Sequence, residues 1–339
     1  MKIIDQKIIG LFVLLLATVF IIVWYEMKEK ELVEENKVEE EEEIIEEPKL
    51  QIIDEDSDSR ILAIMINNHP NTRPHHAGLQ DAFIVYEIIV EGTFTRLLAL
   101  YRDQETERIG SVRSARHYFL DYALEYDAIF IHFGGSPKSY TDLRALGVSN
   151  LDFIARRGFY RDNTLGVAME HRAYTSMALI KEQLENMNMR MTSTTSLLNY
   201  SIDEIVFEGE AIDEFSITYG RTNQVSYEYR DGFYYRSVND VKHTDAITDQ
   251  QYHFKNIVIM RVANYNLDNR GRQELDTVGT GTGYFLSNGV MKDINWSKTS
   301  RSSQTVYTDK NGEPLVFNDG NTIFQIVPMQ AEVNFIKEL

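Results

Sequence analysis

The feature that most constrains this chain is an uncharged stretch near its start, residues 8–25 (IIGLFVLLLATVFIIVWY). Inside a bilayer a backbone must satisfy its own hydrogen bonds, so such a segment crosses as a helix. About 20 apolar residues span the hydrocarbon layer, and this stretch just suffices. Trp24 and Tyr25 stand at its end, where aromatic residues mark a membrane interface. The stretch therefore predicts a transmembrane signal anchor.

The residues flanking the stretch predict its orientation. Lys2 and Lys7 precede it, and glutamate-rich sequence follows. This asymmetry favours a cytoplasmic tip at residues 1–7 and the rest of the chain on the extracytoplasmic face of the cell membrane. The alternative is a cleaved signal peptide, whose apolar region normally runs about 7–15 residues and ends in small residues. This run is longer and ends in bulky residues, which favours the uncleaved anchor.

Charge separates the next segment from the remainder. Residues 26–60 contain 16 acidic and 5 basic residues, which leaves residues 61–339 with a formal charge of −8 out of −18. Self-repulsion predicts an extended or partly helical tether for residues 26–60. The mildly acidic remainder argues against nucleic acid as a partner.

The residue types that are missing exclude several kinds of chemistry. The sequence has no cysteine, so disulfides, thiolate metal sites, cysteine nucleophiles and a lipid-modified cysteine are all excluded. No P-loop, dinucleotide-binding, zinc-protease or serine-hydrolase motif is present. We therefore predict no cofactor and no metal. Whether the protein is an enzyme stays open, with a non-catalytic role favoured.

Residues 61–200 alternate strand and helix signals, which predicts an N-terminal α/β domain. Apolar runs predict buried strands, and apolar stripes or capping residues predict helices. The expected strands are Ile61–Ile66, Thr95–Tyr101 and Ala128–Phe133, and the expected helices are 115–126, 136–146 and 170–187.

Residues 201–339 change to short β-type segments separated by turn signals such as Asp231-Gly232 and Asn288-Gly289. This spacing predicts a mostly antiparallel all-β domain, either a sandwich or a barrel. About 280 residues are more than one core usually holds, so two domains are expected. The predicted fold class is α+β overall.

Polar residues concentrate in three places of the N-terminal domain. Residues 67–87 follow a buried strand and contain Asn68, His69 and Arg73. Loops after strands often build sites. The alternative is a rigid surface loop whose side chains bond its own backbone.

The second place is residues 110–116 (GSVRSAR), and the third surrounds His132 before Gly134-Gly135. Free amides at a helix start, together with Arg113, Ser114 and Arg116, would bind an anion. The alternative is that these arginines pair with local carboxylates. His132 could be a functional group, or equally a core histidine whose ring nitrogens are hydrogen-bonded.

Glu87, Glu91 and Arg96 lie on or beside apolar runs. If they are buried they must be paired, because isolated charges in a core are costly. Glu87 and Glu91 could form a carboxylate pair for acid/base catalysis. They could equally be partners of Arg96 and Arg116.

Long motifs across residues 60–330 resemble the YerB-like lipoproteins of Gram-positive bacteria, a two-domain family of unknown function. The motifs are NNHPNTRPHHAGLQDAFIVYE, EGTFTRLLALY, RIGSVRSARHYFLDYALEYDAIFIHFGGSP, RQELDTVGTGTGYFLSNGV and YTDKNGEPLVFNDGNTIFQIVP. The chain departs from the family in lacking its lipidated cysteine, and in having Thr322-Ile323 where a Thr-Trp pair is usual. The resemblance implies an envelope protein working near peptidoglycan synthesis or remodelling, and it carries over no catalytic residue.

Three functions remain open. The first is a membrane-anchored binding or accessory protein that holds an anionic wall-related ligand, such as peptidoglycan or an anionic wall polymer, or a wall-synthesis protein. The second is a wall hydrolase or transferase that uses Glu87 or Glu91 with His69 or His132. The third is a scaffold that docks through the β domain. The predicted ligand-binding residues are Asn68, His69, Arg73, Glu87, Glu91, Arg96, Arg113, Ser114, Arg116 and His132.

Overall fold

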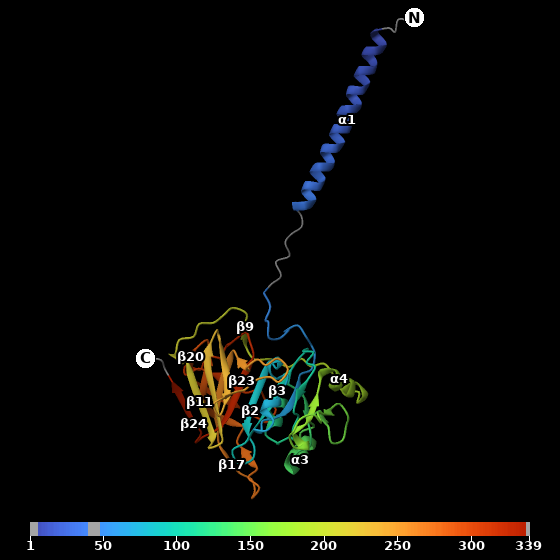
Figure 1. Ribbon diagram of the computed structural model, residues 1–339. Coiled ribbons are helices and arrows are strands. Elements are labelled where there is room, and N and C mark those ends of the chain that lie inside the picture. The colour runs from blue at the N-terminus through green and yellow to red at the C-terminus, as the bar shows by residue number, and fades with distance from the viewer. Residues whose placement is uncertain (1–5, 40–47, 337–339) are drawn as a thin grey trace. The chain divides into compact units, whose positions relative to one another are not determined.

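The computed structural model describes residues 6–39 and 48–336, with side chains placed for residues 10–32 of the first range. The chain divides into two compact units that meet at Pro48 and Lys49. The first unit holds one long helix and the second holds every other element (Figure 1).

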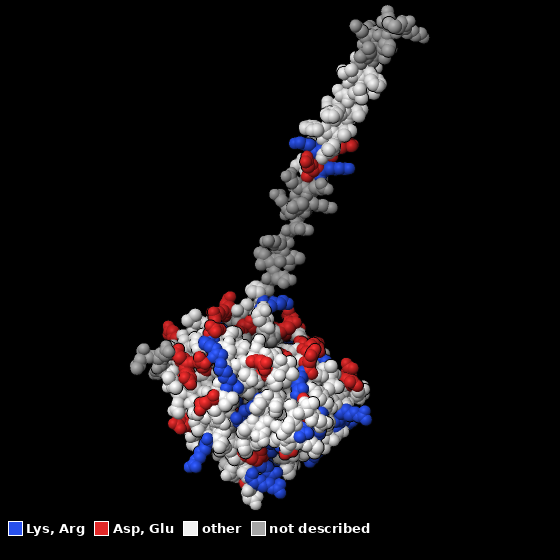
Figure 2. Space-filling view, in the orientation of Figure 1, with Lys and Arg blue, Asp and Glu red and all other residues white. Residues whose placement is uncertain are grey.

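The first helix, α1 (Gln6–Glu39), contains the predicted transmembrane stretch. Among the described residues, one segment is long and apolar enough to cross a membrane, Gly10–Leu32, with a mean hydropathy of 2.2. All of its side chains are exposed, and its apolar part carries no charge (Figure 2). An apolar surface of this length is suited to a bilayer and not to water.

The acidic segment after the apolar stretch has two described parts. Its beginning continues α1 as far as Glu39, and residues 40–47 of the predicted tether lie outside the described residues. Its end joins the folded unit, because Leu50 and Ile53 are buried in the core. The backbone amides of Gln51 and Ile52 donate to the Asp319 carboxylate at 2.7 and 3.0 Å. Residues 49–60 are therefore part of the folded body.

One large mixed sheet forms the centre of the second unit. Its central strands are buried on both faces, as their continuous apolar runs predict. In spatial order the strands are β10 (Glu210–Ala211), β20 (Val290–Lys298), β19 (Gly279–Ser287), β16 (Asn256–Val262), β23 (Thr322–Pro328), β2 (Ile84–Ile89), β3 (Thr95–Tyr101), β1 (Leu62–Asn67), β5 (Ile129–His132) and β6 (Asn150–Asp152), with β21 (Val306–Thr308) paired to β20.

A second, antiparallel sheet is built from residues of the C-terminal half and has one buried face. Its strands are β14 (Val241–Lys242), β13 (Phe233–Val238), β12 (Asn223–Arg230), β11 (Glu214–Gly220) and β24 (Glu332–Ile336), with β15 (His253–Phe254) paired to β13. Three small ladders complete the strands: β17 (Asn264–Asn266) with β18 (Gln273–Leu275), β9 (Tyr200–Ser201) with β22 (Phe317–Asn318), and β4 (Ile109–Gly110) with β8 (Ala173–Thr175) and β7 (Tyr160–Arg161).

Three short α-helices lie in the N-terminal half: α2 (Phe119–Leu124), α3 (Pro137–Ala145) and α4 (Met177–Asn186). Ser136 caps α3 by accepting from the amide of Ser139, as predicted. The helix expected from residue 170 begins only at α4, because Ser176 caps it by accepting from the amide of Leu179. A 3-10 turn (Met169–His171) and β8 occupy the residues before this cap. Two more 3-10 turns, Arg73–His75 and Leu79–Asp81, follow β1.

Alternating side chains of β2 show how the layers pack. Tyr86 points to one face and stacks on Tyr122 of α2, with ring centroids 4.5 Å apart. The next residue, Glu87, points to the other face and pairs with Arg236 of the second sheet at 2.9 Å. Because successive strand residues face opposite sides, the large sheet lies between α2 and the second sheet.

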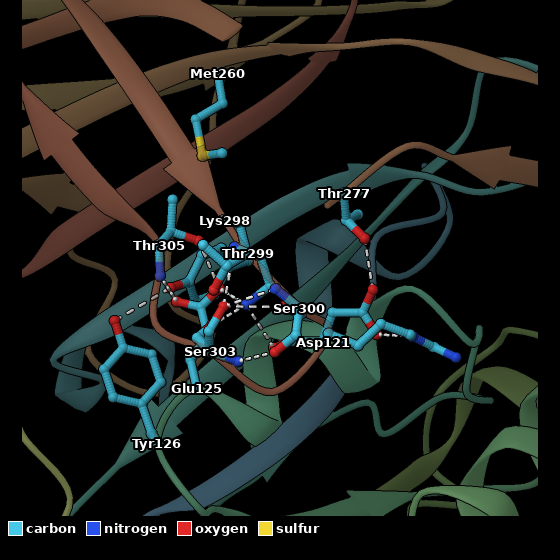
Figure 3. A network of polar contacts seen from close by, with 12 residues as sticks. Asp121, Glu125, Tyr126, Met260, Thr277, Lys298, Thr299, Ser300, Ser303 and Thr305 are labelled. Atoms are coloured by element: carbon cyan, nitrogen blue, oxygen red, sulfur yellow. Dashed lines mark hydrogen bonds and ion pairs between the residues drawn. The ribbon is translucent and has the colours of Figure 1, made fainter. Parts of the chain in front are cut away.

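A buried polar network ties α2 to the hairpin end at residues 298–305 (Figure 3). The Lys298 ammonium pairs with Glu125 at 2.6 Å, and neither side chain is more than 2% exposed. The Thr305 hydroxyl donates to the same carboxylate at 2.7 Å. Nearby, Asp121 accepts from Arg301 at 2.6 Å. Each buried charge is therefore compensated, as a core requires.

These elements confirm the α+β fold class. The first half supplies alternating strands and helices, and the second half supplies mostly antiparallel strands. The large sheet nevertheless crosses the boundary predicted at residue 200, because β23 lies between β2 and β16 and runs parallel to both. The two predicted segments therefore share one sheet within one compact unit.

Candidate functional site

The loop after β1 turns two of the predicted ligand-binding side chains inward. Asn68 is fully buried, and the Arg73 side chain is 8% exposed. The Thr72 hydroxyl donates to the carbonyl of His69 at 2.8 Å, which stabilises the turn locally. Arg73 then donates through Nε to Asn68 Oδ1 at 3.3 Å and through a terminal nitrogen to Asn223 at 3.2 Å. These contacts make Asn68 and Arg73 part of an internal network.

Glu87 is the centre of that network and has no exposed surface. Its Oε1 accepts from Asn68 at 2.9 Å and from the Thr95 hydroxyl at 2.7 Å. Its Oε2 accepts from Gln325 at 3.0 Å and forms the ion pair with Arg236. Both carboxylate oxygens are thus occupied by donors, as a buried charge requires.

A directed chain of hydrogen bonds leads away from Arg236. Its Nε donates to His243 Nδ1 at 3.1 Å, His243 Nε2 lies 2.9 Å from His76 Nδ1, and His76 Nε2 lies 2.5 Å from the carbonyl of Asn67. The order of donors requires that each imidazole is neutral and protonated on Nε2. Burial lowers the pKa of His76 to about 3 and that of His243 well below its usual value. The lowered pKa values and the order of the donors therefore both indicate neutral imidazoles.

Three arginines form what we call the arginine cluster. Arg96 lies at the start of β3, and Arg113 and Arg116 lie in the segment between β4 and α2. Arg96 donates to the carbonyl of Ser114 at 2.5 Å and lies 3.5 Å from Glu91. Arg116 donates through Nε to the same Glu91 at 2.5 Å. One carboxylate therefore serves two guanidinium groups.

Burial and mutual repulsion raise the electrostatic energy of the arginine cluster. Burial lowers the pKa of Arg96 to about 9, and the positive charge of Arg116 adds to the effect. Burial also lowers the pKa of Arg113, with Arg116 again contributing and Glu170 opposing. The three guanidinium groups of the cluster thus interact with two carboxylates, Glu91 and Glu170.

The cluster opens to solvent at one side. Arg96 and Arg116 are buried, whereas Arg113, Ser114 and His69 are half-buried. The imidazole of His69 stacks on His171 with ring centroids 4.9 Å apart. Burial lowers the pKa of His69, and the charges of Arg73 and Arg113 lower it further. A neutral imidazole therefore lies beside a cationic surface.

The predicted helix-start amides do not form the site. Residues 111–113 lie alongside β1, Ala115 bridges to Gly135, and α2 begins only at Phe119. The amides of Val112, Arg113 and Ala115 donate to Ala173, Met65 and Gly134 respectively. These three amides are therefore already bonded, and an anion would be held mainly by side chains.

His132 is separate from the arginine cluster. It is fully buried near the end of β5. Its Nδ1 lies 2.8 Å from the carbonyl of Gly134, and its Nε2 lies 3.4 Å from Asn150 Oδ1. These contacts are those of a satisfied core histidine. Within the residues that the structure describes, no group of three histidine, aspartate or glutamate side chains could hold a metal ion.

Sequence reasoning missed several residues of the buried network, among them Asn223, Arg236 and Gln325. One signal could have revealed Arg236. In β13 the buried positions alternate as Tyr234, Arg236 and Val238, so strand periodicity places this arginine on the apolar face. A buried arginine implies a buried carboxylate partner.

Comparison with known proteins confirms the resemblance read from the motifs. The model of the N-terminal domain of "Protein of unknown function (DUF3048)" matches residues 50–190, and that of its C-terminal domain matches residues 215–323. The protein named "Putative lipoprotein YerB" of Bacillus subtilis (strain 168) is 31% identical over 280 residues, covering 80% of this chain and 82% of that protein. The crystal structure of YerB from Bacillus subtilis superposes with a TM-score of 0.73, covering 81% of this chain and 94% of the other.

Proposed function

We propose that this chain, which belongs to the DUF3048 family of unknown function, is a membrane-anchored extracytoplasmic binding protein. Its ligand is an anion that binds at the arginine cluster. The observation that carries the proposal is the local excess of positive charge. Five arginines, Arg73, Arg96, Arg113, Arg116 and Arg236, lie in two adjoining networks with three carboxylates, Glu87, Glu91 and Glu170. The whole chain carries −18.

The chemistry of the cluster favours an oxyanion. Guanidinium groups form paired, charge-assisted hydrogen bonds with phosphate and carboxylate groups. Arg113 offers a half-exposed guanidinium, and the Ser114 hydroxyl lies beside it in the chain. An added anion would reduce the repulsion between Arg113 and Arg116, which provides a favourable binding term. Phosphate, carboxylate and sulfate groups of peptidoglycan, of an anionic wall polymer or of a wall-synthesis protein fit this chemistry.

The membrane part of the proposal rests on α1. The related YerB is named as a putative lipoprotein, whereas residues 1–339 contain no cysteine to carry a lipid. The exposed apolar helix supports an anchor of a different type, a single-pass signal anchor with the N-terminus inside. The charged residues on both sides of the span support that orientation.

The geometry does not favour a hydrolase or transferase. A general base must reach its substrate and accept a proton. Both oxygens of Glu87 are occupied inside the core, and His132 is fully buried. Glu91 is half-buried but serves two arginines. We therefore assign binding, not catalysis, to this region.

Titration calorimetry with inorganic phosphate, pyrophosphate and sulfate tests the anion site. We expect saturable binding that weakens at high salt, and Arg113→Gln lowers the affinity about tenfold or more, since a charged hydrogen bond contributes about 1.5–3 kcal/mol. Arg157→Gln is the matched control, because Arg157 is exposed and does not belong to the cluster. Absence of binding to all three anions, or equal affinity of Arg113→Gln and the parent chain, would overturn the proposal.

A further inference from the structure

A pocket lies beside Gly92, between the end of β11, the β17–β18 hairpin and the turn after β23. Its volume is about 360 Å³, which is within the range of about 300–1,000 Å³ for small-molecule sites. The backbone joins it to the arginine cluster, because Glu91 bridges to Arg272 and the amide of Gly92 donates to Gly271 at 3.3 Å. The lining residues are Ile89, Gly92, Thr218, Tyr219, Gly220, Asn264, Tyr265, Asn266, Gln273, Pro328, Gln330 and Ala331.

The lining contains no charged side chain, although a quarter of the whole chain is charged. Four side-chain amides, Asn264, Asn266, Gln273 and Gln330, supply its polar groups. Each amide offers both donors and an acceptor. Such a lining complements a neutral molecule rich in hydroxyl groups and offers little to an ion.

Three of the four amides, Asn264, Asn266 and Gln273, are held in position by one another. Asn264 donates through Nδ2 to Gln273 Oε1 at 2.8 Å, and Gln273 donates through Nε2 to Asn266 Oδ1 at 2.6 Å. This ladder crosses the β17–β18 hairpin, whose register places Asn266 opposite Gln273. Groups fixed in this way lose little freedom on binding, which favours affinity.

One polar atom of the ladder is closed to a ligand. Within the described residues, Asn264 Oδ1 is buried and accepts no hydrogen bond. A ligand hydroxyl cannot reach this atom in the observed conformation. The amides that stand open to a ligand are those of Asn266 and Gln330, which are both exposed.

Aromatic surface completes the pocket. Tyr265 is 56% exposed at the hairpin, where such a large side chain has no role in the core. Tyr219 forms a wall, because its hydroxyl donates inward to Gln325 at 2.8 Å and leaves the ring against the pocket. Aromatic rings provide rigid apolar faces with a polar tip. The C–H face of a sugar ring packs on such a surface while its hydroxyls bond to amides.

We propose that this pocket binds a neutral saccharide unit. The combination of side-chain amides and an exposed tyrosine, with no charged side chain, matches a pyranose more closely than it matches an ion or a charged peptide. The inference does not depend on the arginine cluster, since none of the three arginines lines the pocket. Binding at the pocket and binding at the arginine cluster can therefore be tested separately.

The test uses the full chain in lipid nanodiscs and neutral tetrasaccharides of β-1,4-linked N-acetylglucosamine, cellobiose-type and maltose-type linkage. We expect saturable binding of at least one of them by calorimetry. Tyr265→Ala lowers the affinity about tenfold, which corresponds to about 1.4 kcal/mol, and Gln330→Ala lowers it in the same direction. Because both residues are exposed, neither change perturbs the core.

Two controls separate this site from others. Tyr160→Ala removes another exposed tyrosine, 38% exposed and outside the pocket, and it leaves saccharide binding unchanged. Arg113→Gln also leaves it unchanged. The proposal is overturned if no neutral tetrasaccharide binds, if Tyr265→Ala binds as the parent does, or if an uncharged peptide binds in place of the saccharides.

Discussion

Glu87 and Arg236 form an ion pair in which neither side chain has exposed surface. The network around them supplies further donors from Asn68, Thr95 and Gln325. Removing charges from water is costly, so such a pair is stable only when its partners are all present. The pair therefore fixes how the second sheet sits on the large sheet.

Glu87→Gln leaves the Arg236 charge buried and uncompensated. We expect the free energy of unfolding to fall by about 3–5 kcal/mol, the usual effect of removing one partner of a buried pair. Urea unfolding of residues 49–339 measures it. Glu228→Gln is the control, because Glu228 pairs with Arg230 at an exposed site and should change stability by about 1 kcal/mol or less. Equal effects of the two changes would contradict this role.

The two buried histidines predict a dependence of stability on pH. Burial holds the pKa of His76 at about 3 and lowers that of His243, whereas an unfolded histidine has a pKa of about 6.5. Between these values the unfolded chain binds more protons, so stability is greatest above about pH 6.5 and falls as the pH drops. The slope is about 1.4 kcal/mol per pH unit for each histidine. Denaturant unfolding from pH 7.5 to 4 measures the slope, and His243→Gln should reduce it. An unchanged slope in that variant would refute the linkage.

The sequence located the polar residues, and the alternative that Glu91 pairs with Arg96 and Arg116 is confirmed. It did not locate the partners of the buried network. Asn68, Arg73 and Glu87 were predicted as a ligand site because they crowd one short region. In the fold their partners include Gln325, which lies 238 residues after Glu87, and pairings at such separation leave no local pattern. The open part of the site, at Arg113 and Ser114, was predicted from arginine side chains and from amides at a helix start. The helix-start part of that reasoning is wrong, because α2 begins only at Phe119 and the amides of Val112, Arg113 and Ala115 are bonded within the fold.

At the scale of elements, β23 links the two halves of the chain. It pairs in parallel with β2 on one side and β16 on the other, and all seven of its residues are buried. Without it, β2 would expose an apolar edge, which is prone to aggregation. The two halves of the chain thus share one sheet, with β23 at their junction.

We therefore expect residues 49–200, expressed alone, not to form a monomeric folded domain. Refolding this fragment together with residues 201–339 should restore the near-ultraviolet circular dichroism of the intact chain, because β2 regains its partner. Size-exclusion chromatography of each fragment and of the mixture is the measurement. A monomeric fragment 49–200 that unfolds cooperatively by itself would show that β23 is dispensable.

Strong local signals were sufficient for several elements. The strand Thr95–Tyr101 was predicted with its observed bounds, and Ser136-Pro137 marked the start of α3. The helix expected at 115–126 shortened to six residues, although its aromatic residues are core as predicted. The sequence analysis did not predict that the two halves of the chain share one sheet, because strand order depends on contacts between distant segments.

At the scale of the whole molecule, α1 and the folded unit have distinct tasks. The helix contains a segment of 23 residues, Gly10–Leu32, that is long and apolar enough to cross a membrane. The folded unit shows acidic and basic side chains interspersed over its visible face (Figure 2). We expect deletion of residues 1–48 to move the protein from the membrane fraction to the soluble fraction, since the rest of the chain is a compact unit. Ultracentrifugation of cell lysates measures this. Retention of residues 49–339 on membranes would assign the anchoring elsewhere.

The central claim is that an oxyanion binds at the arginine cluster. Crystals of residues 49–339 grown with selenate and recorded at the selenium absorption edge locate such an anion directly. We expect an anomalous peak within hydrogen-bonding distance of the Arg113 guanidinium, beside Ser114 and Arg116. Selenate bound elsewhere on the protein, with no peak at a solvent-accessible arginine cluster, would contradict it.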